Sequence, residues 1–158
     1  MPRPARDVAV PDMIPPFTPS AAVERRASSW VVFSYSRLPT GVRRVNGFLL
    51  SLPTDCDDLA LGSAIIEATD NSHEIPDESS LPTESMHELL GFRSASAYMK
   101  GTETVEVFHM SPTTVEIEDL DHRGTWFAVP TPRRITTAPA DDAEALGRAV
   151  RSMFDAKT

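Results

Sequence analysis

The sequence GFLLSLPTDCDDLALGSAIIEA, residues 47–68, is the stretch on which the fold prediction depends. Its apolar start is typical of a strand, and Pro53 ends that strand because proline has no N–H to donate to a sheet. Carboxylates at the start of a helix cap its free N–H groups, although they could also form a metal or partner site. Three acids stand at this point: Asp55, Asp57 and Asp58. Leu61 and Ile65 then repeat at helical spacing, so we expect a helix over residues 57–69.

A second version of this pattern begins at Gly124. Residues 129–131 (VPT) match 52–54 (LPT), and residues 145–147 repeat the ALG of 60–62, with eight extra residues between the two anchors of the later copy. We therefore expect one domain built from two related strand-loop-helix units. Gly62 and Gly147 interrupt both expected helices, at a cost of about 1 kcal/mol each relative to alanine. This repeated cost suggests that each helix lies close to the sheet at its glycine.

The rest of the chain supplies the other elements of an α+β fold. About five mainly antiparallel strands are expected, with helices packed on the sheet. Alternating or β-branched runs predict strands over 30–36, 45–52, 104–110, 113–119 and 125–129, and a loop over 130–140. Two short helices are expected at 84–90 and 94–100, and a last helix at 141–154. Residues 1–28 are rich in proline and predict an extended or disordered arm, with at most a helical turn at 21–26, so the domain is expected to span 29–158.

Composition narrows the classes of function. The net charge of −8 argues against a protein held on nucleic acid by phosphate contacts. The single Cys56 fits a reducing compartment, and no apolar run approaches the roughly 18 residues of a membrane-spanning helix. We therefore expect a soluble, cytoplasmic protein, with no membrane partner and no cofactor.

The negative charge is concentrated in one part of the chain. Residues 45–92 contain ten acids and no Lys or Arg. This region is either a solvated surface or a docking face for a basic partner. Because Asp57 and Asp58 are expected to cap a helix, the loop acids carry most weight as candidates, followed by those of the 104–119 hairpin. The partner-binding candidates are Asp70, Glu74, Asp77, Glu78, Glu84, Glu88, Glu106, Glu116 and Glu118.

No stretch of the sequence has the spacing of a catalytic or metal-binding motif. The four histidines do not form H-E-x-x-H or a related pattern, and no serine lies in G-x-S-x-G. No catalytic, metal or cofactor residue is therefore assigned. A small hydrolase using His109 or His122 with nearby acids stays open as an alternative, because catalytic groups can assemble from distant positions.

Four short segments together resemble the immunity proteins of bacterial contact-dependent growth inhibition systems. They are GFLLSLP at 47–53, LGxAI at 61–65, VEV at 105–107 and LGxAV at 146–150, and the resemblance covers about residues 30–154. It implies a non-enzymatic protein that binds and blocks a cognate toxin domain, often a cytosolic nuclease. A nuclease surface tends to be basic, which an acidic inhibitor would suit. An acidic secretion chaperone, also small and α+β, is the alternative, and it should display a large apolar patch or a dimer seam.

Overall fold

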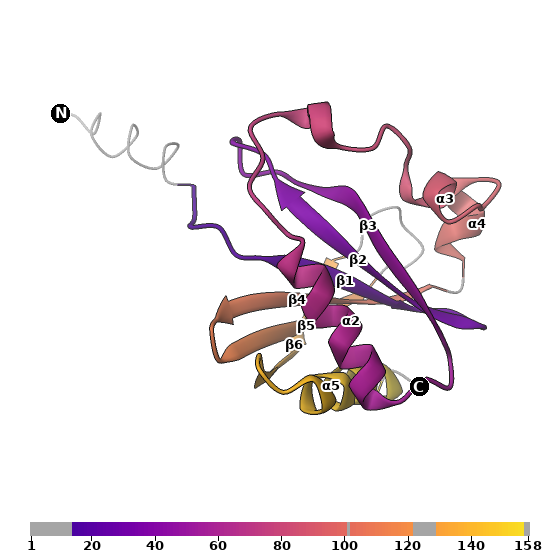
Figure 1. Cartoon of the computed structure of the whole chain (residues 1–158). Coiled ribbons are helices and arrows are strands. Elements are labelled where there is room, and N and C mark those ends of the chain that lie inside the picture. Colours follow the sequence, from indigo (N-terminus) through magenta and orange to yellow (C-terminus); the bar gives the residue numbers. More distant parts are fainter. Residues whose placement is uncertain (1–13, 101, 122–128, 157–158) are drawn as a thin grey trace.

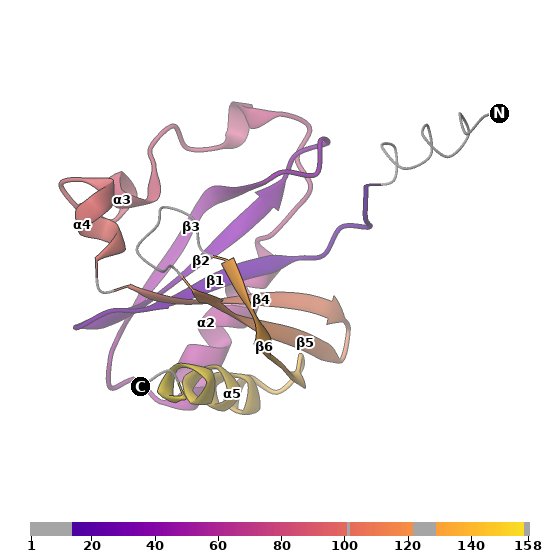
Figure 2. The same cartoon turned by 180° about the vertical axis from the view of Figure 1, so that it is seen from behind.

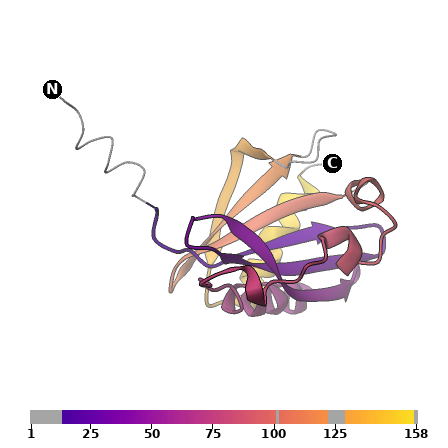
Figure 3. The ribbon, with the colours of Figure 1, turned by 90° about the horizontal axis from the view of Figure 1, so that it is seen from above.

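One antiparallel sheet organises the chain. In the computed structural model, which describes residues 14–100, 102–121 and 129–156, six strands follow the order β3-β2-β1-β4-β5-β6 (Figure 1). Side chains are described for 14–100, 102–120 and 135–156. The sheet twists strongly, so β2 and β3 run obliquely to β4 and β5 (Figures 1 and 3). The α+β class and the antiparallel sheet are confirmed.

The sheet consists of two similar units. The first unit is a three-stranded meander followed by a helix: β1 (Ser20–Arg25), β2 (Ser29–Arg37), β3 (Arg43–Pro53) and α2 (Asp58–Asp70). The second unit repeats this order: β4 (Glu103–Ser111), β5 (Thr114–Asp121), β6 (Val129–Pro139) and α5 (Ala143–Asp155). Between the units lie η1 (Glu78–Ser80), α3 (Met86–Leu89) and α4 (Ala95–Met99). The expected repeat is therefore present, with three strands in each copy.

An approximate two-fold axis relates the units at the centre of the sheet. There β1 pairs antiparallel with β4, and the contacts Ala21↔Val107 and Val23↔Val105 are reciprocal. Outside this pair, Ser29 at the start of β2 faces Pro53. Thr114, at the start of β5, faces Pro139 in the same way. Equivalent positions in the two copies therefore differ by about 85 residues along the whole unit.

This register corrects part of the repeat alignment. The residue of the second unit that is equivalent to Pro53 is Pro139, since both end a strand. Pro130, which the sequence alignment matched to Pro53, lies at the beginning of β6. The eight additional residues counted between the anchors therefore belong to a strand, and the loop expected over 130–140 is wrong. The strand expected over 125–129 falls, apart from Val129, outside the described residues. The helices expected at 57–69 and 141–154 are confirmed to within two residues.

The first strand was not expected from the sequence. Residues 20–25 form β1 at the centre of the sheet, so the helical turn proposed for 21–26 is wrong and the arm cannot extend to residue 28. Ala21, Ala22 and Val23 are fully buried. The density of proline suggested an arm over residues 1–28, but all six prolines of that segment stand before Ser20. Residues 1–13 lie outside the described part of the chain.

One face of the sheet packs against α2 and α5 and carries the main core. Val23, Val32 and Ile117 are fully buried there. The Trp30 and Phe154 rings meet edge to face, with centroids 5.1 Å apart, which joins the first unit to α5. Asp57 caps α2 by accepting a hydrogen bond from the Ala60 N–H at 2.8 Å, so the capping role is confirmed for this acid. We call this side of the sheet the helix face.

The paired glycines mark the point where α2 touches α5. An ideal Cβ built on Gly62 would lie 1.7 Å from the Ala143 carbonyl oxygen, and one on Gly147 would lie 1.9 Å from that of Asp58. Each glycine therefore faces the backbone one turn before the other glycine. The expected close approach at the glycines is confirmed. The expectation that each helix approaches the sheet there was wrong, because α2 and α5 approach each other.

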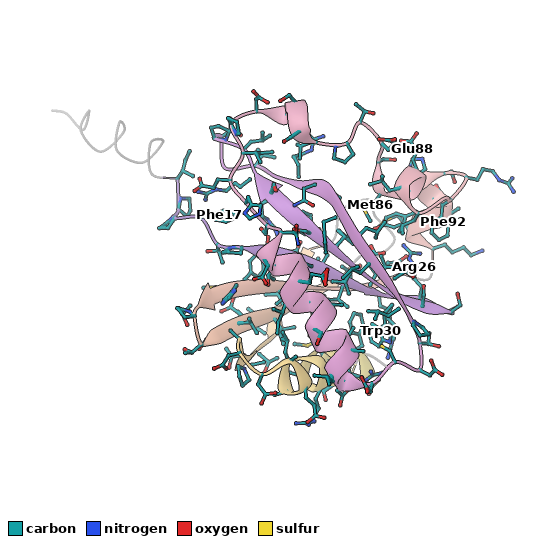
Figure 4. The ribbon with its side chains drawn as sticks, viewed as in Figure 1. Phe17, Arg26, Trp30, Met86, Glu88 and Phe92 are labelled. Atoms are coloured by element: carbon teal, nitrogen blue, oxygen red, sulfur yellow. The ribbon has the colours of Figure 1, made fainter. Side chains whose placement is uncertain are left out.

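On the opposite face of the sheet, the described part of the chain covers the first unit only. Ala22, Val31 and Phe33 form a second apolar cluster, against which Met86 and Leu90 pack. These last two belong to residues 71–100, which we call the cover. Figure 4 shows Met86 and Phe92 at the side of the sheet away from Trp30, and Figure 2 shows α3 and α4 clear of β5 and β6. The two faces of the sheet thus have different roles.

Candidate functional site

The loop acids favoured by the sequence mostly have partners within the fold. Glu74 pairs with Arg37 at 3.1 Å, and Glu78 pairs with Arg44. Both arginines stand outside residues 45–92, which is why a count within that stretch missed them. A count of charges within residues 45–92 therefore overstates the uncompensated charge at these two carboxylates.

Two further loop acids shape the local backbone of the cover. Asp77 accepts hydrogen bonds from the side chain and N–H of Ser79, which lower its pKa. Glu88 accepts from the Ser85 N–H at 2.9 Å and completes a capping box at α3, which lowers its pKa as well. Asp70 and Glu84 are exposed. For all six of these acids a role in partner binding is a prediction from the sequence, and the described structure adds no observation in its favour.

The three hairpin acids, in contrast, lie together. Glu106 on β4 is directly opposite Glu118 on β5, and Glu116 lies two residues before Glu118 on the same side of the strand. Their neighbours Val105, Val107 and Ile117 point to the helix face, so these carboxylates lie on the opposite face. We call Glu106, Glu116 and Glu118 the acidic patch.

One arginine compensates part of this charge. Arg43 donates to both carboxylate oxygens of Glu106, at 3.0 and 3.1 Å. Its guanidinium lies over the rings of Tyr35 and Phe108, at 4.6 and 5.1 Å from their centroids. Arg43 is thus fixed by its bonds to Glu106. It makes no hydrogen bond to Glu116 or Glu118 and acts on Glu118 through its charge alone.

The pKa of Glu118 reflects the repulsion that remains among the three carboxylates. Its pKa is raised, first by partial burial and then by the charges of Glu116 and Glu106, against the opposing effect of Arg43. A carboxyl group whose pKa is higher in the folded state stabilises the fold at low pH. That contribution is lost as the pH rises through the raised pKa. The acidic patch is therefore a place where the folded protein carries unfavourable charge at neutral pH.

Glu118→Gln is expected to stabilise the protein by about 0.5 kcal/mol at pH 7, because the amide removes one like charge from a cross-strand pair. The gain should shrink below the ordinary glutamate pKa of about 4.5, where the carboxyl group is protonated in both states. Urea unfolding of both proteins at pH 7 and pH 4 measures the difference. Equal stabilities at pH 7 would show that the repulsion is screened.

An open groove borders the acidic patch. Its walls come from the chain before β1, the start of β3, and the β4–β5 hairpin. The lining includes Arg43, Phe108, Met110, Glu116 and Glu118. Exposed apolar side chains flank the carboxylates: Met110 is 54 % exposed and Ile135, across from Glu118 on β6, is 48 % exposed. The arrangement suits a protein side chain with an apolar stem and a cationic head.

A buried ionic cluster, which the sequence did not indicate, lies at the first unit's end of the same face. Glu24 is 2 % exposed and accepts hydrogen bonds from Arg26, at 2.9 Å, and from the Tyr98 hydroxyl. The Arg26 guanidinium lies over both the Phe92 and the Tyr98 ring, 4.7 and 4.5 Å from their centroids, and the two rings contact each other edge to face (Figure 4 labels Arg26 and Phe92). The cluster fastens α4 to β1.

Burial raises the pKa of Glu24, and the hydrogen bond from Tyr98 and the charge of Arg26 oppose that shift. Glu24, Arg26 and Tyr98 thus bond to one another, and their role is to hold the cover against the sheet. Only the adjacent Arg25-Arg26 pair could have signalled it, and that pair fell in the segment expected to be an arm.

The described histidines, His73, His87 and His109, form no metal-binding cluster. Among the residues that the structure describes, no three His, Cys, Asp or Glu side chains are placed to hold a metal ion. His87 Nδ1 lies 2.8 Å from the Ser85 hydroxyl on the cover, and His109 stands on β4. His122 lies outside the described residues. No described helix is both long enough and apolar enough to cross a membrane.

Comparison with known proteins supports the fold. No protein-family model matches the chain, and no curated protein matches it significantly. Among solved structures, a protein of unknown function from Neisseria meningitidis aligns with a TM-score of 0.73 and 16 % identity, over 89 % of this chain and 95 % of that one. A chain of a CdiA-CT/CdiI toxin and immunity complex from Yersinia pseudotuberculosis aligns with a TM-score of 0.69 and 13 % identity, over 89 % and 97 %. At these identities the likeness is one of fold.

Proposed function

We propose that this protein is an immunity protein, which binds a cognate contact-dependent growth inhibition toxin and blocks it by occlusion. The observation that carries the proposal is the alignment with a chain of a CdiA-CT/CdiI toxin and immunity complex over 89 % of this chain. Four sequence segments resemble the same class independently of the structure. Three of them lie on β3, α2 and α5, and the fourth lies on the central strand β4.

Charge supports a basic partner. The chain carries a net charge of −8, and among the side chains that the structure describes Arg43 pairs with Glu106 of the acidic patch, whereas Glu116 and Glu118 have no ion pair. A toxin that cleaves nucleic acid needs a basic surface to hold phosphates. We therefore propose a nuclease toxin, and an inhibitor that covers the phosphate-binding surface would stop it without any chemistry of its own. The cytoplasm, where such a toxin would act, is the proposed compartment.

We expect a large secreted protein to be encoded next to this gene, and its C-terminal domain is the toxin with which the proposal is tested. Cells producing that domain from an inducible promoter are expected to stop growing, and co-expression of this protein should restore growth. The two purified proteins should form a complex in size-exclusion chromatography. Unchanged growth arrest, with no complex between the two folded proteins, would contradict the proposal.

A matched control separates protection from general effects of expression. The same toxin domain should be challenged with Gly62→Leu, which is expected to destabilise the fold strongly while it leaves the charge of the chain unchanged. Protection by the wild-type chain and none by this variant ties the effect to the folded protein. A hydrolase alternative would instead require His109 or His122, so a folded His109→Ala, His122→Ala variant that fails to protect would revive it.

A further inference from the structure

The two-fold relation between the units shows which part of the sheet is left without a cover. Counting from Ser29 and Thr114, which face Pro53 and Pro139, Val31 corresponds to Glu116 and Phe33 to Glu118. Their cross-strand neighbours agree: Phe33 faces Leu49 as Glu118 faces Ile135. The same structural positions are therefore apolar in the first unit and acidic in the second.

The surroundings of these positions differ in the same way. Val31 and Phe33 are each 3 % exposed, because Met86 and Leu90 of the cover pack over them. Glu116 and Glu118 are only half-buried, and Ile135 is 48 % exposed. No described segment covers this half of the sheet. A sheet face is normally hidden by a second layer, and the described residues supply that layer to the first unit only.

Resting on the proposed function, we propose that the toxin docks on the exposed face of β4, β5 and β6, and that Glu116 and Glu118 accept an arginine or lysine side chain from it. The occupant is identified by charge. Two carboxylates beside an apolar rim of Met110 and Ile135 would receive the cationic head and the methylene stem of one side chain. The toxin thus takes the place that the cover takes over the first unit.

The proposal also explains why unfavourable charge persists on the face. Arg43 is already committed to Glu106 by two hydrogen bonds and by its two ring contacts. A cation from the partner would neutralise the repulsion between Glu116 and Glu118, which Arg43 only partly offsets in the isolated chain. Binding should therefore be steered by charge and weaken as salt rises.

The test measures the affinity of the toxin domain for three proteins by calorimetry and surface plasmon resonance. Wild-type chain is compared with Glu116→Lys, Glu118→Lys and with the control Asp70→Lys, Glu84→Lys, which makes the same charge change on exposed loop acids. We expect the patch variant to bind at least about 30-fold more weakly and to lose the normal salt dependence. The control should stay within about threefold of wild type.

The outcomes separate this proposal from the proposed function. If wild type binds and the control loses affinity while the patch variant does not, the docking face is the loop region and the inference is wrong. If wild type itself fails to bind or protect, the proposed function fails first. Glu116→Gln, Glu118→Gln, which cannot repel the toxin, should also weaken binding. Full affinity in this neutral variant would show that the carboxylates make no contact.

Discussion

Replacing Gly62 with alanine is expected to destabilise the protein by about 3 kcal/mol or more. In an exposed helix the same change would stabilise by about 1 kcal/mol, because alanine has the higher helix propensity. Here the added Cβ would stand 1.7 Å from the Ala143 carbonyl oxygen and 3.0 Å from the Gly147 nitrogen. Both neighbours are backbone atoms, so no side chain can move aside, and the helices must separate along their whole contact.

Urea unfolding followed by circular dichroism measures this effect, with Ser63→Ala as the control. Ser63 is the next residue of α2 and is exposed, so its change should be neutral or slightly stabilising. Gly147→Ala should cost about as much as Gly62→Ala, and the double variant should cost clearly less than their sum, because one separation relieves both clashes. A loss below about 1 kcal/mol for both single variants would show that the helices do not touch at these glycines.

Replacing Arg26 with alanine is expected to cost about 3–5 kcal/mol at pH 7. Arg26 is the cation bonded to Glu24, a carboxylate that is 2 % exposed, and its removal would leave that charge buried with only the Tyr98 hydroxyl. The pKa of Glu24, already raised by burial, should rise further. A buried carboxylate with a raised pKa costs stability when it is ionised, and that cost disappears when the group is protonated. The loss of unfolding free energy in the variant should therefore shrink as the pH falls from 7 toward 5.

Arg25→Ala is the matched control for this prediction. Arg25 pairs with Glu103 and Asp155 at the edge of the fold, and Asp155 is 65 % exposed in its side chain, so about 1 kcal/mol is expected. Limited proteolysis adds a second measurement: Arg26→Ala should open cleavage in the cover, because Arg26 also donates to the Tyr98 carbonyl at 3.0 Å. Equal stability of the two variants, with the cover still resistant, would contradict a fastening role.

The sequence predicted those elements whose signals are local. The β4–β5 hairpin has alternating apolar residues, and α2 and α5 have helical periodicity with acids at their starts, so their bounds were found closely. Strand β1 gave no such signal: six residues with two alanines and a charged end do not reach a strand pattern, and its place is fixed by β2 and β4 on either side. Likewise β6 contains three prolines at 130, 132 and 139, which is tolerable because it is an edge strand.

The candidate site was predicted only in part, for a related reason. Glu106, Glu116 and Glu118 are separated by up to 12 positions, but the hairpin register places them on one surface, and the sequence named all three. The sequence ranked them below the loop acids because a count of charges within residues 45–92 does not show which carboxylates are paired in the fold. Glu74 and Glu78 pair with Arg37 and Arg44, which precede the acidic stretch in the chain and approach it only in the folded protein.

The reciprocal glycine contact has a consequence for how such a protein can diversify. Because α2 and α5 lock the two copies together on the helix face, the scaffold does not depend on what stands on the other side of β5 and β6. Substitutions on that exposed face should therefore cost little folding stability. If the face binds a toxin as proposed, one unit can change its partner while the glycine contact preserves the architecture.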